Sequence, residues 1–304
     1  MSIGQSGQGH RSVLLHEAVD ALELKKGDTV VDATLGGAGH SLEILKSLGS
    51  NGTLIGFDAD AEAIQRSEKA LSNAQATVHL VHNNFRHVRQ ELEALGIHTI
   101  DKALYDLGWS SYQLSAGRGF SFLADEPLSM AYSAAQELSA ETIVNDWSEE
   151  SIADILYGWG EERYSRRIAK AIVEARSSKR ITTSGELGEL IKQAVPVAYR
   201  FGRIHPATKS FQALRIAVND ELGALTDSLK QTWSMLGNGG RIAVISFHSI
   251  EDRLVKQQFV AWSESGEGIR ITKKPIIPSE NEVKENPRSR SAKLRVIEKQ
   301  NKYE

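Results

Sequence analysis

The chain has no cysteine among its 304 residues. This absence excludes disulfide bonds, zinc sites built on cysteine and every mechanism that needs a thiolate nucleophile. Oxygen and nitrogen groups must therefore carry any chemistry. The rest of the composition, with 40% hydrophobic and 25% charged residues, is typical of an ordinary globular protein with one large domain and a smaller one.

Long hydrophobic runs are missing as well. No run of apolar residues is long enough to cross a bilayer. Residues 1–7 have neither the basic region nor the apolar core of a secretion signal. We therefore expect a cytoplasmic protein without a membrane partner.

The chain also lacks an excess of positive charge. The chain has 36 Lys and Arg residues against 39 Asp and Glu residues, which gives a formal net charge of -3. A general affinity for polyanions is therefore not expected, and a polyanionic partner would need a local basic patch.

The most informative segment that is present covers residues 30–40. The apolar run of residues 29–31 at its start favours a buried strand, and the apolar residues after it recur at helical spacing. Between them lie Gly36, Gly37 and Gly39. A glycine turn that ends on a helix N-terminus lets a ligand approach the backbone and offers it free N–H groups. The segment predicts a nucleotide-sized site, although a tight turn between strand and helix is the plainer alternative.

Two common nucleotide patterns fail in this loop. The third glycine of a dinucleotide fingerprint would fall on Leu42, and the lysine of a phosphate-binding loop is replaced by His40. The remaining common ligand of such a loop is S-adenosylmethionine (SAM), which carries no phosphate. His40 therefore stands out as a side chain suited to a phosphate-free cofactor.

The next predicted strand, residues 53–58, ends on Asp58. A carboxylate at the carboxyl end of the second strand can accept hydrogen bonds from both ribose hydroxyls of an adenosine. The alternative is a helix N-cap, a role that Asp60 could equally fill. We predict that Asp58 binds the ribose.

Strands and helices alternate along the first third of the chain, with further strands expected at residues 77–81 and 102–106. Residues 115–203 then show an almost wholly helical pattern, in which Thr183 and Glu186 have the spacing of a capping box. Strands resume at residues 241–246 and around Leu294. The predicted fold is an α/β, doubly wound, Rossmann-like domain of residues 1–114 and 206–304 that binds SAM. Residues 115–205 form a mainly helical insertion, predicted to recognise the substrate.

Several segments together resemble one protein family almost from end to end. They cover residues 10–15, 32–40, 106–114, 118–122, 160–164, 205–208, 211–216, 246–253 and 290–295. In these segments the chain resembles the bacterial 16S ribosomal RNA (cytosine-N(4))-methyltransferases, the family called RsmH or MraW. The resemblance implies methylation, with SAM, of the exocyclic amine of a cytidine in the decoding region of the small ribosomal subunit.

The resemblance also implies site residues and partners. The implied SAM contacts are Ala38, Gly39, His40, Asp58, Phe85, Asp106 and Gln113. Phe85 would cover the adenine, although core packing is its alternative role. The implied partner is 16S ribosomal RNA in the small subunit, and a homodimer is one option for the oligomeric state. No metal is expected.

Asp106 is the candidate catalytic residue. The lone pair of a cytosine amine is delocalised into the ring, so the enzyme must hold the amine and accept hydrogen bonds from it. Many amino-methyltransferases have two prolines here, whereas this chain has Leu107, Gly108 and Trp109 after Asp106. Asp106 is therefore expected either to accept the amine N–H groups or to orient the methionine end of SAM. Methylation of a pyrimidine carbon usually needs a cysteine, so nitrogen or oxygen is the expected acceptor.

Two basic clusters are candidate RNA contacts, although charged faces are often merely solvated. The clusters are Arg163, Arg166, Arg167 and Lys170 on one predicted helix, and Arg288, Arg290, Lys293 and Arg295. The substrate candidates among them are Arg163, Arg166, Arg167, Arg290 and Lys293. Trp109 would stack on a flipped base or lie buried between the domains. His205 and His248 are expected to have structural roles.

The chain departs from the family pattern at Ser12, where proline is usual, and at residues 125–132, which have lost charged residues. The second departure concerns RNA positioning rather than the SAM site. Two other functions remain open: a SAM enzyme acting on another RNA, DNA or small molecule, and a non-catalytic RNA-binding assembly protein. The substrate is either naked RNA or the assembled subunit.

Overall fold

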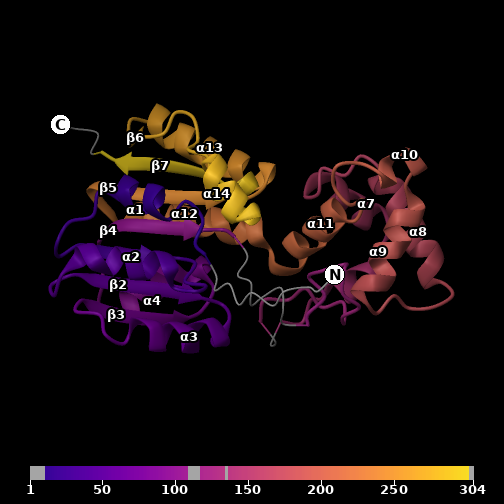
Figure 1. The fold of residues 1–304 in the computed structure, drawn as a ribbon, viewed down its shortest axis with the longest axis horizontal. Helices are drawn as coiled ribbons and strands as arrows, with labels where there is room; N and C mark the ends of the chain where they lie inside the picture. Colours follow the sequence, from indigo (N-terminus) through magenta and orange to yellow (C-terminus); the bar gives the residue numbers. More distant parts are fainter. Residues whose placement is uncertain (1–10, 109–116, 134–135, 301–304) are drawn as a thin grey trace. The chain divides into compact units, whose positions relative to one another are not determined.

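The computed structural model describes residues 11–108, 117–133 and 136–300. The chain divides into two compact units (Figure 1), one of residues 1–110 and 223–304 and one of residues 111–222. We call them unit 1 and unit 2.

Unit 1 is built on a seven-stranded sheet with the order β3-β2-β1-β4-β5-β7-β6 (Figure 1). Its strands are β1 (Thr29–Asp32), β2 (Thr53–Asp58), β3 (Thr77–His82), β4 (Ile100–Asp106), β5 (Leu236–Ser246), β6 (Gly268–Arg270) and β7 (Lys293–Lys299). The strands β1 to β5 pair in parallel, whereas β7 runs antiparallel to both β5 and β6. Each predicted strand is present, and the doubly wound, Rossmann-like fold class is confirmed. Among the described strands, β7 departs from the parallel sheet that the sequence predicted.

Helices cover both faces of this sheet because successive strand residues point to opposite sides. Val30 packs with α1 (Leu15–Leu22), α2 (Gly39–Leu48) and α3 (Ala61–Leu71). Its neighbour Val31 packs with α4 (Val88–Ala94), α12 (Glu221–Met235) and α13 (Ser249–Glu264). Burial on both faces explains the near-continuous apolar runs of the central strands. Unit 1 also contains η1 (Phe85–His87), α14 (Glu280–Glu285) and η2 (Pro287–Ser291).

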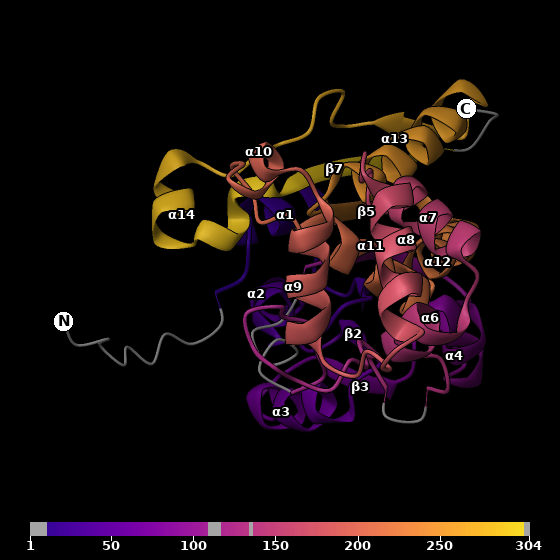
Figure 2. The ribbon, with the colours of Figure 1, turned by 90° about the vertical axis from the view of Figure 1, so that its right-hand side faces the viewer.

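Unit 2 is mainly helical. Its helices are α6 (Ala140–Asp146), α7 (Glu149–Gly158), α8 (Ser165–Arg176), α9 (Ser184–Ala194), α10 (Val197–Arg200) and α11 (Thr208–Asn219). Figure 2 shows α8 and α9 packed together, with α10 at one end of α9. The helix α9 begins where the sequence predicted, because the Thr183 hydroxyl accepts a hydrogen bond from the Glu186 N–H. The Glu186 carboxylate accepts from the Thr182 N–H instead of completing the capping box at Thr183.

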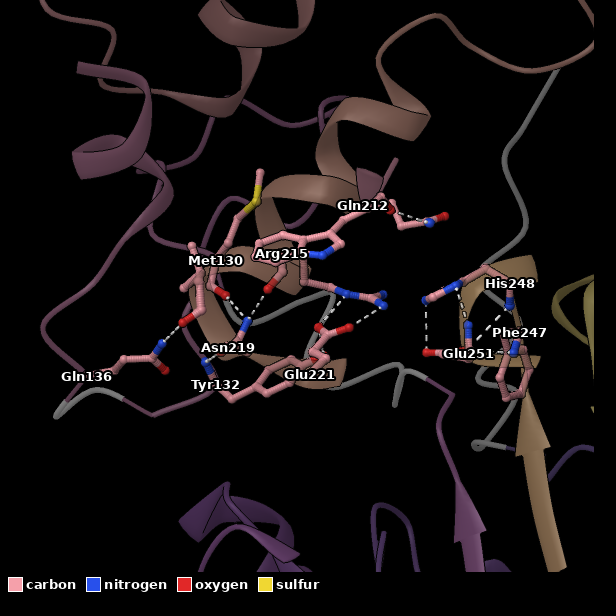
Figure 3. A network of polar contacts seen from close by, with 12 residues as sticks. Met130, Tyr132, Gln136, Gln212, Arg215, Asn219, Glu221, Phe247, His248 and Glu251 are labelled. Atoms are coloured by element: carbon pink, nitrogen blue, oxygen red, sulfur yellow. Dashed lines mark hydrogen bonds and ion pairs between the residues drawn. The ribbon is translucent and has the colours of Figure 1, made fainter. Parts of the chain in front are cut away.

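Unit 2 extends further than the predicted insertion of residues 115–205. The helix α11 belongs to it because α11 packs against α6 and α7. Figure 3 shows how the end of α11 is tied to residues 130–132: the Asn219 side chain accepts from the Tyr132 N–H and donates to the Met130 carbonyl. A buried ion pair between Arg215 and Glu221, 2.6 Å apart, lies beside it.

The helical prediction is wrong for residues 117–133, which contain no helix. Gly119 has φ +76°, a left-handed conformation that suits glycine. A Cβ at Gly119 would also lie only 2.5 Å from the Pro127 carbonyl oxygen. Instead of helical hydrogen bonds, the segment uses side chains: the Gly119 N–H donates to Glu126, and the Arg118 guanidinium donates to the Tyr132 carbonyl. These contacts satisfy the backbone groups without a helix.

No helix within the described ranges combines the length and the apolar character needed to cross a bilayer.

Candidate active site

The acidic residues of the candidate site stand at the carboxyl ends of parallel strands. Asp32 ends β1, Asp58 ends β2 and Asp106 ends β4. These strands are neighbours in the sheet, so their ends meet at one edge, where ligands of open α/β sheets bind. Two predicted residues, Trp109 and Gln113, lie outside the described part of the chain. The other predicted SAM contacts all follow the carboxyl ends of β1 to β4.

The glycine loop connects β1 to α2 as the sequence predicted. Gly36 has φ +50°, and Ala38, the residue before α2, has φ +58°. A left-handed alanine is uncommon and marks a tightly constrained turn. Gly39 is required by packing within the protein, because a Cβ there would collide with the Ser12 hydroxyl. Close contact with Ser12, rather than with a ligand, therefore explains this glycine.

Asp58 joins the glycine loop to the end of β2. Its Oδ2 accepts a hydrogen bond from the Gly36 N–H and its Oδ1 accepts one from the Asp60 N–H, each 2.9 Å long. The N-cap of α3 is Asp60, whose side chain accepts from the Glu62 N–H. The N-cap alternative for Asp58 is therefore wrong. Burial raises the pKa of Asp58 to about 6, although the two backbone hydrogen bonds oppose the rise.

The Asp58 carboxylate fits a ribose. A carboxylate has about four lone-pair sites, and backbone N–H groups occupy one on each oxygen. One site on each oxygen is left for the two hydroxyls of an adenosine. Such charge-assisted hydrogen bonds would be strong at this largely desolvated position.

No role for Asp32 was predicted from the sequence. Its carboxylate is fully buried, accepts a 2.6 Å hydrogen bond from the Ser41 hydroxyl and accepts another from the Thr34 N–H. Burial raises the pKa of Asp32, while the hydrogen bond from Ser41 lowers it. The sequence did contain a signal for a buried acid beside the glycine loop, because Asp32 is the last residue of the strand before that loop.

Asp106 is held by contacts that reach back to the glycine loop. Its backbone N–H donates to the Thr34 hydroxyl at 2.6 Å, and its Oδ1 accepts from the Gly108 N–H at 3.2 Å. Its Oδ2 lies 3.5 Å from Nδ1 of His40. Gly108 has no room for a side chain, because a Cβ there would lie 2.7 Å from the Phe247 ring.

His40 is placed differently from the expectation that its side chain faces the cofactor. The ring is buried, with Nε2 lying 3.1 Å from the Val13 carbonyl oxygen and Nδ1 facing Asp106. Both ring nitrogens therefore face groups of the protein. His40 is the second residue of α2, so its backbone lies in the first turn, where N–H groups lack helical partners.

Phe85 lies in η1, just past β3. Its ring contacts Tyr105 edge to face, with 5.8 Å between the ring centroids, and it is half-buried against the core. Tyr105 is fixed in turn by hydrogen bonds of its hydroxyl to Ser228 and Thr232, each 2.7 Å long. Phe85 therefore makes the contact with the core that its alternative role requires. Part of its ring is also exposed and is available to cover an adenine.

The first basic cluster is exposed on unit 2. Arg166 and Arg167 lie on α8, opposite the buried Ile168. Arg163 does not share this helix, contrary to the prediction, because α8 begins only at Ser165. The Arg163 guanidinium instead lies over the rings of Tyr164 and Tyr199, at 4.7 and 4.8 Å from their centroids. Cation–π contacts of this kind hold a cation without neutralising it.

The second basic cluster is largely structural. Arg295 is buried and binds Asp252 with two hydrogen bonds, and Lys293 binds the same carboxylate at 3.0 Å. Burial would raise the pKa of Asp252, but the hydrogen bonds from Arg295 and Lys293 outweigh it and hold the pKa below its usual value. Arg290 lies in η2 and is exposed, as a residue that contacts RNA must be.

The two histidines have the expected structural roles. His248 is the N-cap of α13 and forms a capping box with Glu251, whose carboxylate accepts from the Phe247 and His248 N–H groups (Figure 3). His205 stacks on Phe122 at 4.3 Å and accepts from the Ala207 N–H.

The turn after α10 was not predicted from the sequence to be a functional surface. Phe201 is 84% exposed there, and Arg203 is exposed as well. Arg200 is fixed by donating to the Gln193 and Val195 carbonyls at the end of α9. The alternation of Tyr199, Arg200, Phe201 and Arg203 was the available signal, since exposed aromatic and basic residues together are typical of surfaces that bind single-stranded nucleic acids.

The relatives that match nearly the whole chain include three proteins that each carry the name ribosomal RNA small subunit methyltransferase H. The protein of Clostridioides difficile is 45% identical over 306 residues, which cover 95% of this chain and 98% of the relative. The protein of a Paenibacillus species is 46% identical, with 95% and 99% of the two chains covered. The protein of Lactobacillus delbrueckii is 47% identical, with 95% and 98% covered.

A family profile described as the MraW methylase family matches residues 7–300. This match confirms the resemblance noted in the sequence, the methyltransferase class and the cofactor, SAM. With the match spanning both units and relatives about 45% identical, the chain belongs to the MraW methylase family.

Proposed function

We propose that the protein methylates the exocyclic N(4) amine of a cytidine in the decoding region of 16S ribosomal RNA. The observation that carries the proposal is the position of Asp106, an acid at the carboxyl end of β4 held against the glycine loop. The three relatives named ribosomal RNA small subunit methyltransferase H support the choice of ribosomal RNA.

The residues around the glycine loop fit SAM. We propose that Asp58 accepts both ribose hydroxyls, that Phe85 covers the adenine, and that the backbone of residues 38–40 contacts the cofactor. When bound, SAM supplies a methyl group on a sulfonium sulfur, which an uncharged amine can attack directly. A nitrogen acceptor agrees with a chain that lacks cysteine and cannot activate a ring carbon with a thiolate.

We propose that Asp106 is the acceptor for the amine N–H groups. As the amine attacks, its nitrogen gains positive charge, and a carboxylate close by stabilises that charge and takes the departing proton. A role in orienting the methionine end of SAM is the alternative, and Gln113 is a further proposed cofactor contact. The two roles of Asp106 separate in one comparison, because only the orienting role requires weaker SAM binding in an Asp106 variant.

We propose that unit 2 recognises the RNA through Arg163, Arg166, Arg167 and the exposed Phe201. The arginines would neutralise phosphates, and Phe201 would offer a face on which a base can stack. Arg290 and Lys293 are weaker candidates, because Lys293 already binds Asp252. Trp109 remains proposed for the flipped base, and the cytoplasmic location remains a prediction.

Incubation with methyl-labelled SAM and undermethylated small subunits, followed by mass spectrometry of the nucleosides, tests the proposal. Label in N(4)-methylcytidine from 16S RNA is the expected result. Label on a different RNA, DNA or small molecule would favour the second function, and no transfer despite RNA binding would favour the assembly protein. Parallel reactions with naked 16S RNA identify the form of the substrate.

A further inference from the structure

The side chain of His40 has its tautomer set by the backbone. Its Nε2 lies 3.1 Å from the carbonyl oxygen of Val13, and a carbonyl oxygen can only accept a hydrogen bond. Nε2 must therefore carry a hydrogen. In the neutral ring, the other nitrogen, Nδ1, then has no hydrogen and presents a lone pair.

That lone pair faces an acid. Nδ1 lies 3.5 Å from Oδ2 of Asp106, with the His40 side chain only 5% exposed and the Asp106 side chain 15% exposed. A lone pair and a carboxylate oxygen repel one another unless a proton lies between them. The pair is therefore arranged to take up one proton at this place, and burial strengthens the effect because little water screens it.

We propose that His40 receives, through Asp106, the proton released when the acceptor amine is methylated. This inference rests on the proposed role of Asp106 at the amine. His40 is a positioning residue in this scheme, because it acts on the reacting nitrogen only through Asp106.

The step balances without a further reactant. The amine lone pair forms the new N–C bond, and the electrons of the broken S–C bond stay on sulfur, which becomes a neutral thioether. The nitrogen, now positive, loses one proton to Oδ of Asp106. That proton moves to Nδ1 of His40, which becomes an imidazolium with its Nε2–H still bonded to Val13. Asp106 is again a carboxylate, and the proton leaves to solvent before the next turnover.

The charges around His40 favour this transfer. The groups that act on it are Asp106 on β4 and Asp32 at the end of β1. Asp32 is tied to Ser41 and Thr34, so it adds negative potential without competing for Nδ1. An imidazolium between two acids is electrostatically stabilised. A purely structural histidine would need only the hydrogen bond to Val13 and would gain nothing from a bare nitrogen aimed at Asp106.

Nitrogen NMR of the imidazole tests the pair without any turnover. The expected neutral tautomer has its hydrogen on Nε2, and the Nδ1 signal of His40 should differ between the wild-type protein and Asp106→Asn, because Nδ1 faces Asp106. A neutral form with its hydrogen on Nδ1, or the same Nδ1 signal in both proteins, would overturn the inference. The result is independent of which RNA is methylated, so it stands even if the proposed substrate is wrong.

Turnover of His40→Gln tests the consequence. Glutamine keeps an N–H for Val13 but removes the basic Nδ1. At saturating SAM and RNA we expect kcat to fall about 100-fold, the size of a general-base contribution. The loss should appear in kcat and not in the KM for SAM. The exposed His16→Gln is the matched control and should keep the wild-type kcat.

Two further results define the outcome. SAM affinity in His40→Gln should stay within about twofold of wild type, because the ring faces the protein. An unchanged kcat, or a loss of turnover that excess SAM restores, would mean that His40 only supports the loop.

Discussion

The acids of unit 1 and the cations of unit 2 are held in opposite ways. Asp32, Asp58 and Asp106 stand at strand ends. Backbone N–H groups donate to the carboxylates of Asp32 and Asp58, and the Asp106 backbone N–H donates to the Thr34 hydroxyl. Arg166 and Arg167 instead lie on the exposed face of α8, and Arg163 is steadied by two tyrosine rings. The acids have fixed geometry, and burial raises the pKa of Asp32 and of Asp58. The cations instead keep their access to solvent.

This contrast assigns the two kinds of work to different regions. Chemistry and cofactor binding need fixed groups in a desolvated place, where each hydrogen bond is strong. Binding to a long polyanion needs accessible charge, and its strength then depends on salt. Substitutions among the acids should therefore change turnover or SAM affinity, and substitutions on α8 should change RNA affinity.

The largest effect is expected from Asp106→Ala. Loss of the acceptor should lower methyl transfer at saturating SAM by about 1000-fold or more, within the range of acid–base catalysis. The rate of label transfer to small subunits measures it. Asp154→Ala, on the exposed side of α7, is the control. Unchanged turnover would remove Asp106 from both of its proposed roles.

A smaller effect, on SAM affinity, is expected from Asp58→Asn. Hydrogen bonds to a charged group contribute about 1.5 to 3 kcal/mol, so SAM should bind roughly 10- to 100-fold more weakly. Calorimetric titration with SAM measures this change. The exposed Glu62→Gln, on α3, should bind SAM like wild type. Equal affinities in Asp58→Asn and wild type would show that the ribose is held elsewhere.

The pH dependence of SAM affinity should test the same role of Asp58. Burial raises the pKa of Asp58 to about 6. Because ribose hydroxyls prefer the ionised carboxylate, SAM affinity should fall about tenfold per pH unit below that value. The slope should disappear in Asp58→Asn, and its persistence there would assign the titration to another group.

The same pKa has a consequence for folding. Between about pH 4 and 6 the folded state holds a proton on Asp58 that the unfolded chain has released. Asp58 therefore stabilises the fold at low pH, and this contribution is lost as the pH rises through the folded pKa. Chemical denaturation across this window should show the loss in wild type and not in Asp58→Asn.

The smallest effects are expected on unit 2. Phe201→Ala should weaken binding of single-stranded 16S fragments about fivefold or more, because stacking of one base contributes about 1 to 3 kcal/mol. Arg166→Gln with Arg167→Gln should weaken it further at low salt and flatten the salt dependence by about two phosphates. Arg89→Gln, an exposed arginine of unit 1 paired with Glu93, is the control. A change in SAM affinity in these variants would contradict the assignment of cofactor binding to unit 1 and RNA binding to unit 2.

The strand ends were predictable from sequence because local patterns determine them. An apolar run that ends on an acid places Asp58 and Asp106 correctly, and the glycines mark the turn before α2. These features depend on residues close together in the chain. The strand positions were correct for the same reason.

The remaining features depend on distant residues. His40 turns inward because of the Val13 carbonyl, which is 27 residues away. Arg295 is withdrawn from the predicted RNA surface by Asp252, 43 residues earlier. Residues 117–133 lose their predicted helix to contacts such as the one between Leu128 and Thr182. Spacing along the chain cannot reveal such partners, because they meet only after folding.

The most direct test of the central proposal uses SAM with a trideuterated methyl group and undermethylated small subunits. Digestion of the 16S RNA and mass spectrometry of its nucleosides should show the heavy methyl group on N(4) of a cytidine with the wild-type protein and none with Asp106→Ala. A heavy methyl group on a ring carbon, on another nucleoside, or at equal amounts in the Asp106→Ala reaction would contradict the proposal.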